Sequence, residues 1–334
     1  MPSICFYFEV HQPFRLANIG RAANASCQDF FDTDLNRAIF RKVAENCYLP
    51  TTALLLQLIK HHEGEFKISF SLSGVFIEQM LLWGPDVLLN FQKLAQTGCV
   101  EFLAETYYHS LASLYDEHEF ADQVRMQVSL IEVLFGSRPK VFRNTELIYD
   151  NRIGILAAAM GFQGVIAEGV DDILGWKSPN YLYRVPQTDT ALLLKNYKLS
   201  DDIAFRFSNR QWNEFPLTAD KFSGWIDSQT DSADTINLFM DFETFGEHQW
   251  RDSGIFEFLS FLPTHILKSK RWDFKTPSEV INAYPPKDDL SFRRLTSWAD
   301  AERDITAWRG NTMQERMLRD IYDIGDQVKA TGDK

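Results

Sequence analysis

Two acidic side chains, Glu146 and Asp241, each come at the end of a short apolar run of the sequence. The first run covers 141–143 and the second covers 235–241. A lone glutamate is usually a surface or helix-capping residue, but Arg143 and other polar side chains crowd the turn around Glu146. Two carboxyl groups at the ends of two strands are the equipment of glycoside hydrolysis. The pair therefore predicts acid–base chemistry on a sugar bond.

The two acids would take different roles in a retaining mechanism. One ionised carboxylate attacks the anomeric carbon, and one protonated acid releases the leaving oxygen. Arg143, close to Glu146 in the sequence, would favour its charged form and suit a nucleophile. Asp241 follows the apolar residues 238–240, which would raise its pKa and suit an acid. We expect these two carboxyl groups about 5–5.5 Å apart, with Glu243 pointing to the same face as Asp241.

Further polar residues follow other apolar runs. His11 and Gln12 come directly after 3–10, where a proline ends the run because it cannot continue a central strand. His109 comes shortly after 98–104, behind a glutamate and two tyrosines. A lone histidine is more often structural than functional, but the position at a strand end favours function. We expect these side chains to bind sugar hydroxyls.

The elements that must position these residues alternate along the chain. Apolar runs that are typical of buried strands are separated by segments with helical spacing, which favours parallel β–α–β units. Right-handed crossovers bring the carboxyl end of every such strand to the same face, so residues far apart in the sequence should meet at one mouth. The expected strands are 3–10, 65–72, 98–104, 141–143, 162–167, 191–196 and 235–241.

The character of the sequence changes after Trp272. The length of 334 residues suits one large barrel domain with an accessory segment. We predict a (β/α)7 catalytic barrel over residues 1–272 and a helical segment over residues 273–334, packed on the barrel mouth. Trp298 and Trp308 lie in this segment, and we expect them to stack on sugar rings.

Composition narrows the classes of partner. A net charge of -12 disfavours nucleic acid and anionic membrane surfaces. No run approaches the roughly 20 apolar residues of a membrane span, and the first ten residues lack the basic start of a signal peptide. The 4 cysteines have no disulfide or zinc spacing. We therefore expect a cytoplasmic protein that binds neither nucleic acid nor membrane; the oligomeric state stays open.

At these residues the chain resembles glycoside hydrolase family 57, the α-amylase and 4-α-glucanotransferase group. That family is identified by five short regions, and each has a counterpart in this order. The counterparts are His11–Pro13, Gly98–His109, Arg143–Glu146, Met240–Glu247 and Trp298–Asn311.

The resemblance implies an incomplete TIM-like (β/α)7 barrel with a C-terminal helical segment, which agrees with the seven expected strands. It implies Glu146 as the nucleophile, Asp241 as the acid/base, and retention of configuration on α-glucans, without a cofactor or metal. Arg143, Glu243 and Asp300 would then contact the substrate. Similarity is greatest to the α-amylase members, which continue with further helices after the fifth region, so we expect a smaller helical layer over the substrate here.

Three alternatives stay open from the sequence. A 4-α-glucanotransferase or branching-type transferase would use the same site, because the residues do not separate hydrolysis from transfer. A metal-dependent hydrolase, such as a polysaccharide deacetylase, would need histidines and carboxylates with ligand spacing, and the adjacent His61 and His62 lack it. A non-catalytic glucan-binding module would keep the binding residues without turnover.

Overall fold

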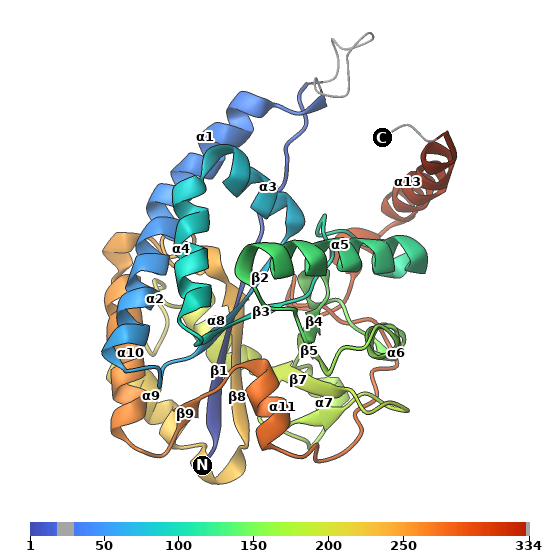
Figure 1. Ribbon diagram of the computed structural model, residues 1–334. Coiled ribbons are helices and arrows are strands. Elements are labelled where there is room, and N and C mark those ends of the chain that lie inside the picture. Colours follow the sequence, from blue (N-terminus) through green and yellow to red (C-terminus); the bar gives the residue numbers. More distant parts are fainter. Residues whose placement is uncertain (19–29, 332–334) are drawn as a thin grey trace.

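The structure is a computed structural model that describes residues 1–18 and 30–331. Seven parallel strands form its centre, and helices surround them (Figure 1). These strands are β1 (Ser3–Val10), β2 (Ile68–Leu72), β3 (Val100–Leu103), β4 (Val141–Arg143), β5 (Gly164–Glu168), β7 (Ala191–Lys195) and β8 (Thr235–Asp241). All seven expected strands are present, and 141–143 and 235–241 agree with their predicted bounds. The predicted α/β architecture is confirmed.

The parallel strands belong to two sheets, in the orders β3-β2-β1-β8 and β4-β5-β7-β6. One seam between the sheets is the isolated parallel bridge of Ala104 with Phe142. At the other seam, the Asn196 amide donates to the carbonyl of Asn237 at 2.9 Å, and the Asn237 side chain donates to the carbonyl of Leu194 at 2.8 Å. The two seams close the strands into a barrel, but the described residues form no continuous ladder of hydrogen bonds around it.

Two strands were not predicted, namely β6 (Tyr183–Arg184) and β9 (Asp273–Phe274). The strand β6 pairs with β7 in the antiparallel sense, and β9 pairs in parallel with the start of β1. Each has two residues, which is too short to show an alternating pattern.

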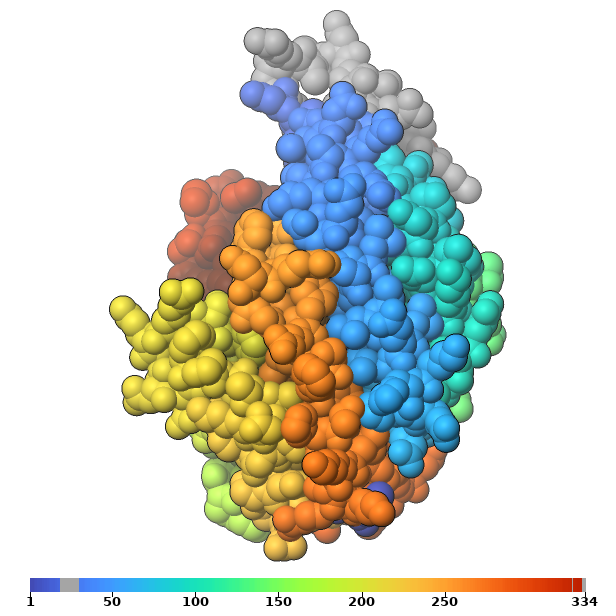
Figure 2. Space-filling view, turned by 90° about the vertical axis from the view of Figure 1, so that its left-hand side faces the viewer, coloured from blue at the N-terminus to red at the C-terminus, as the bar shows by residue number. Residues whose placement is uncertain are grey.

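The α-helices lie outside the strands, mainly in the connections between them. They are α1 (Thr33–Val43), α2 (Leu49–His61), α3 (Gly74–Trp83), α4 (Pro85–Gln96), α5 (Glu117–Phe135), α6 (Asn151–Ala159), α7 (Asp171–Leu174), α8 (Tyr197–Ala204), α9 (Ala219–Asp227), α10 (Ile255–Lys268), α11 (Pro277–Ala283), α12 (Thr306–Arg309) and α13 (Thr312–Thr331). A π-helical turn (Ala44–Tyr48) joins α1 to α2, and 3-10 turns are η4 (Ala112–Leu114), η5 (Thr145–Leu147), η6 (Thr230–Ser232), η7 (Phe242–Thr244) and η8 (Arg251–Ser253). Figure 2 shows α2 in blue beside α10 in orange on one outer face.

Local chemistry explains most helix ends. The sequence predicts a helix over 117–135, and α5 has these bounds, because Asp116 accepts hydrogen bonds from two backbone amides at its start and Gly136 ends it with φ 75°. The sequence predicts Thr51, after Pro50, as the cap of the second helix. The structure shows that α2 begins at Leu49 with Pro50 in its first turn, where a proline needs no amide hydrogen.

The barrel strands carry the core. Every residue of β1, β2, β5 and β7 is buried, as expected of parallel strands covered on both faces. Cys5, Cys47 and Cys99 are buried free thiols, while Cys27 lies outside the described residues. Among the described residues, no helix combines the length and the hydrophobicity needed to cross a bilayer.

The segment after residue 272 is less uniform than the sequence indicated. Its first part, β9 and α11, lies at the amino ends of the strands, where Ser278 donates to Glu101 of β3. The chain then returns to the mouth, where Thr296 pairs with Tyr149, and α13 lies beyond it (Figure 1). The boundary at residue 272 stays a prediction, but the segment is not wholly helical and only part of it lies at the mouth.

Candidate active site

The strand ends bring Glu146 and Asp241 to the same place. Glu146 lies in η5, three residues after β4 ends, and Asp241 is the last residue of β8. Both side chains line the same two small cavities, of about 190 and 200 Å³. The two acids that the sequence singled out, 95 residues apart, therefore face shared space.

Four hydrogen bonds fix Glu146. Its Oε1 lies 3.0 Å from Nε2 of His109, and its Oε2 accepts a hydrogen bond from the Trp298 indole at 2.8 Å. Its carbonyl accepts from the Ser297 hydroxyl at 2.8 Å and from the Trp298 amide at 3.2 Å. The segment after α11 thus closes directly over the candidate nucleophile.

The backbone at this turn is strained. Glu146 has φ 53° and ψ 29°, Leu147 has φ 49°, and His109 has φ 53°. Residues other than glycine rarely adopt this left-handed conformation, which costs of order 1–3 kcal/mol each. The surrounding hydrogen bonds hold Glu146 and His109, whose side chains face each other, in this unfavourable backbone conformation.

The pKa values of the two acids move in opposite directions. Burial alone would raise the pKa of Glu146, but His109, Arg143 and the Trp298 N–H lower it to about 2. Burial raises the pKa of Asp241, and the negative charge of Glu146 raises it further. Paired acids with separated pKa values can divide the roles of nucleophile and general acid.

His109 carries a positive charge in this arrangement. Its Nε2 faces the Glu146 carboxylate, and its Nδ1 lies 3.2 Å from a carboxylate oxygen of both Glu9 and Glu105. A carboxylate only accepts hydrogen bonds, so both ring nitrogens must donate. Burial alone would lower the pKa of His109, but Glu9, Glu105 and Glu146 raise it to about 10. Our prediction that His109 binds sugar hydroxyls stays untested, and both of its nitrogens already face protein carboxylates.

Arg143 lies behind the site rather than on its wall. Its side chain is fully buried, forms an ion pair with Glu9, and lies 3.6 Å from Glu105. The guanidinium also lies 5.3 Å from the centre of the Trp298 ring. A direct contact between Arg143 and substrate, as the sequence suggested, would need this cluster to open, so an electrostatic role fits its position better.

His11, Gln12 and Glu243 line the cavity of about 200 Å³ together with both acids. The His11 ring stacks on His109, with centroids 4.1 Å apart, and burial and the nearby positive charges lower its pKa well below the usual value. Burial raises the pKa of Glu243 to about 8. The structure thus places these three predicted residues beside the acids.

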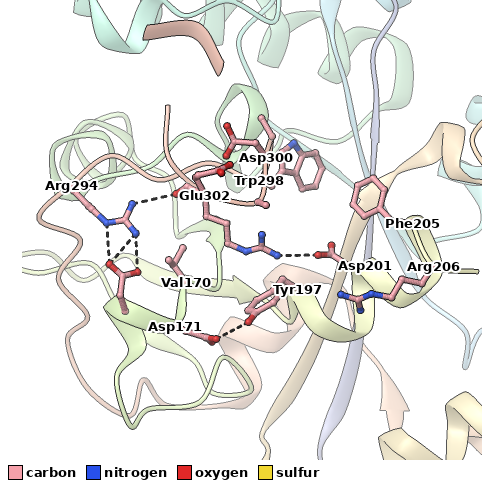
Figure 3. Close-up of a pocket in the computed structure, with 14 residues that line it drawn as sticks. Val170, Asp171, Tyr197, Asp201, Phe205, Arg206, Arg294, Trp298, Asp300 and Glu302 are labelled. Carbon is pink, nitrogen blue, oxygen red and sulfur yellow. Dashed lines mark hydrogen bonds and ion pairs between the residues drawn. The ribbon is translucent and has the colours of Figure 1, made fainter. Parts of the chain in front are cut away.

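A larger cavity of about 600 Å³ adjoins the cavity of about 190 Å³. It shares Phe205, Trp298 and Ala299 with the cavity of about 190 Å³. Figure 3 shows Trp298 and Phe205 at one side of it, with Tyr197 below. Asp300 also lines it, and its Oδ1 is buried without a hydrogen-bond partner among the described residues.

Trp308, like Arg143, is a predicted site residue that lines none of these cavities. It is half-buried against a hydrophobic cluster that includes residues of β4, β5 and β7. Its predicted stacking on a sugar ring is therefore not supported by its position.

Sequence reasoning missed two charged residues of the site. Glu9 is the single charged residue of β1, which is otherwise apolar apart from Ser3, and a lone charge in a buried strand was a usable signal. Lys195 ends β7 and lines the cavity with both acids, 3.1 Å from Asp201. Its Nζ lies 5.0 Å from the centre of the Trp298 ring, so it supports the indole that bonds Glu146.

A cluster of Glu9, Glu105 and His109 has ligand atoms within 4.8 Å of one another, as a metal site would. Arg143 is paired with Glu9 and close to Glu105, so a cation is already built into the cluster. His109 is protonated by this geometry and could not bind a metal in that form. The residues therefore do not suit a metal ion, which weakens the deacetylase alternative.

Comparisons with known proteins agree with this geometry. The family model described as glycosyl hydrolase family 57 matches residues 5–292. A protein of Methanocaldococcus jannaschii named "Putative alpha-amylase" is 46% identical over 335 residues, which cover 99% of this chain and 71% of that protein.

Two crystal structures share the fold. A 4-alpha-glucanotransferase from Thermococcus litoralis matches with a TM-score of 0.68 and 18% identity, over 89% of this chain and 42% of that one. A branching enzyme of the same type from Pyrococcus horikoshii matches with a TM-score of 0.70 and 15% identity, over 95% of this chain and 76% of that one. This chain thus spans less than half of the glucanotransferase, and these likenesses bear on the fold alone.

Proposed function

Because the chain belongs to glycosyl hydrolase family 57 and is a glycoside hydrolase, we propose that it cleaves α-1,4 bonds of α-glucans with retention of configuration. The substrates would be starch, glycogen or maltooligosaccharides. The observation that carries the proposal is the pair of carboxyl groups that line the same cavities with opposite pKa shifts. The relative named as an amylase supports the substrate class.

The proposed mechanism is a double displacement. The ionised Glu146 attacks the anomeric carbon while Asp241 gives its proton to the leaving oxygen, so the C–O bond breaks and a glycosyl ester forms. Asp241, now a carboxylate, then takes a proton from water, whose oxygen attacks the same carbon and releases Glu146. The lowered pKa of Glu146 and the raised pKa of Asp241 match these starting states.

The other predicted residues would bind the sugar units next to the bond. We propose that His11, Gln12 and Glu243 contact the hydroxyls in the cavity of about 200 Å³. Trp298 and Asp300 would do so in the larger cavity of about 600 Å³. A cytoplasmic location also remains part of the proposal, supported by the buried free thiols Cys5, Cys47 and Cys99.

Replacing either acid tests the proposal. We expect Asp241→Asn to lower kcat on maltooligosaccharides by about 10²–10⁴-fold, the usual contribution of a general acid, and Glu146→Gln to lose at least as much. Reducing-sugar release measures both. Glu132→Gln is the matched control, since Glu132 is exposed and paired with Arg138. Equal release from the wild type and Glu146→Gln would overturn the proposal, and glycogen binding without turnover in the wild type would indicate a binding module.

A transferase is the second candidate, favoured by the adjoining cavity of about 600 Å³, which has room for a second sugar chain. In that reaction an acceptor hydroxyl would replace water in the second step. Products formed from maltoheptaose separate the two candidates. Short products alone indicate hydrolysis, and products longer than the substrate indicate transfer.

A further inference from the structure

Glu9 occupies an unusual position for a carboxylate. It lies in β1, which has a neighbouring strand on each side, and its side chain is 4% exposed. One oxygen forms an ion pair with Arg143, and the other lies 3.2 Å from Nδ1 of His109. A buried carboxylate costs several kcal/mol unless charged partners compensate for the lost water. Both compensating cations here are groups that also act on Glu146.

The charges that face His109 come from several elements. Glu9 lies in β1, and His11 directly follows that strand. Glu105 follows β3, Arg143 ends β4, and Glu146 lies in η5. Three carboxylates therefore surround two cations, and Glu9 is in direct contact with both cations. No such contact links Glu9 to Glu146 itself, so Glu9 acts on the nucleophile through its neighbours.

We propose that Glu9 is a positioning residue of this site, which holds Arg143 and the protonated His109 ring behind the Glu146 carboxylate. The proposal rests on the proposed function, in which Glu146 is the nucleophile. Glu9 also lines the cavity of about 200 Å³, but its side chain is only 4% exposed, so it acts on the reaction through Arg143 and His109. Without it, Arg143 would lose its closest partner, and Nδ1 of His109 would keep Glu105 as its carboxylate partner.

The ionised form of Glu9 depends on the same cluster. Burial raises the pKa of Glu9 well above its usual value, and the charges of Arg143 and His109 oppose that rise only in part. Arg143 is always charged and is fully buried, so it needs an anion in contact, and Glu9 provides the closest one. The contacts with Arg143 and His109 therefore favour the charged carboxylate of Glu9 against the effect of burial.

The titration of His109 tests this proposal without any need for turnover. In histidine-labelled protein, NMR shifts of the ring report protonation, and His109→Gln identifies the His109 signals. We expect wild-type His109 to stay protonated well above pH 7, since its pKa is raised to about 10. In Glu9→Gln, the midpoint should fall by about 1–2 pH units, the usual effect of losing one adjacent charge. An unchanged midpoint, or a wild-type ring that is neutral at pH 7, would overturn the proposal.

Kinetics provide a second readout that a merely structural role would not move. Glu9→Gln should lower kcat more than it changes KM, because the buried Glu9 side chain acts through Arg143 and His109. Its activity should decline on the alkaline side at a lower pH than the wild type, as His109 loses its proton. Glu101→Gln is the matched control, because Glu101 is a strand carboxylate at the other end of the barrel, bonded to Ser278; it should leave the His109 midpoint unchanged.

If Glu9→Gln does not fold, the variant Glu9→Asp tests the proposal in its place. The shorter carboxylate cannot reach both cations, so the His109 midpoint and kcat should fall part of the way. Values identical to the wild type would overturn the proposal. A wild type without glucan turnover would overturn only the proposed function, because the NMR titration would still show whether Glu9 keeps His109 protonated.

Discussion

At the scale of single residues, the electrostatics around Glu146 decide what the site can do. His109 and Trp298 each place a donor on one of its two oxygens. Hydrogen bonds to a charged group favour the charged form. The side chain is therefore kept as an anion at the point where a sugar carbon would be attacked, while burial keeps Asp241 ready to release a proton.

Trp298→Phe should separate the hydrogen bond from the packing of the ring. Losing a bond to a charged group costs about 1.5–3 kcal/mol, which corresponds to a rise of about 1–2 pH units in the pKa of Glu146. Glu146 must be ionised to react, so activity is present above its pKa and is lost as pH falls through it. The missing donor raises that pKa, so the acid limb of the kcat/KM profile should move to higher pH.

Trp225→Phe serves as the control for this measurement. Trp225 lies in α9 and packs on Trp212 and Phe222, outside the residues that line the three cavities at the acids. An acid limb that stays in place in Trp298→Phe, as in this control, would show that the indole N–H does not set the charge of Glu146.

The sequence located the two acids and their immediate neighbours, because the ends of parallel strands share one face. It did not identify Glu9 or Lys195 as site residues, because their contacts with the site come from residues that are distant in the sequence. It also assigned Arg143 to the substrate, although the fold buries that side chain completely. A strand-end position predicts nearness to the mouth but not whether a side chain forms the wall or stands behind it.

At the scale of elements, the turn after β8 is held tightly against the π-helical turn at 44–48. Gly246 has φ 114°, and a Cβ atom there would lie 2.1 Å from the carbonyl oxygen of Asn46. Only glycine accommodates both this backbone conformation and this close approach. The turn that follows Asp241 is thus fixed from outside the barrel.

Gly246→Ala should destabilise the protein by about 2–5 kcal/mol, because backbone strain and a backbone clash add. Gly224→Ala is the control, since Gly224 lies in α9 and an added Cβ meets no atom within 4 Å. That change should stabilise by about 0.5–1 kcal/mol. Denaturant unfolding measures both, and equal midpoints for the two variants would contradict the account of this turn.

Elements with a clear period were predictable, and the others were not. The sequence predicts helices over 85–96 and 117–135, and α4 and α5 have these bounds, because each shows helical spacing and has a turn or capping residue at its ends. The strands β6 and β9 were missed because two residues carry no period, and pairing with an existing edge defines them. Tertiary contacts therefore decide the shortest elements.

At the scale of the whole molecule, the final helix is attached weakly. The helix α13 contacts the barrel through the Tyr322 ring, which stacks on Tyr115 at 5.1 Å, and through an ion pair of Lys329 with Glu119. Such contacts contribute about 1–2 kcal/mol together. The segment 273–309 differs, because β9 extends the sheet and residues 296–298 bond the turn that holds the nucleophile.

Truncation tests this division. Removing residues 312–334 should lower Tm by only a few degrees, whereas removing residues 273–334 should abolish the cooperative melt, because the barrel would lose β9, α11 and the cover over Glu146. Circular dichroism on heating measures both. A cooperative melt for the 1–272 fragment would contradict this expectation and support the domain boundary that the sequence predicts.

The two seams of the barrel separate the reacting groups. Glu146 follows β4 of one sheet, while Asp241 ends β8 of the other, and no continuous strand ladder joins the two sheets. Ladder hydrogen bonds resist sliding along their whole length, but each seam relies on a few bonds, such as those between Asn237 and the end of β7. The gap between the two carboxyl groups therefore spans two parts of the barrel that only a few bonds join. We expect substitutions at a seam to change the spacing of the acids, and with it the course of the reaction, while leaving both acids in place.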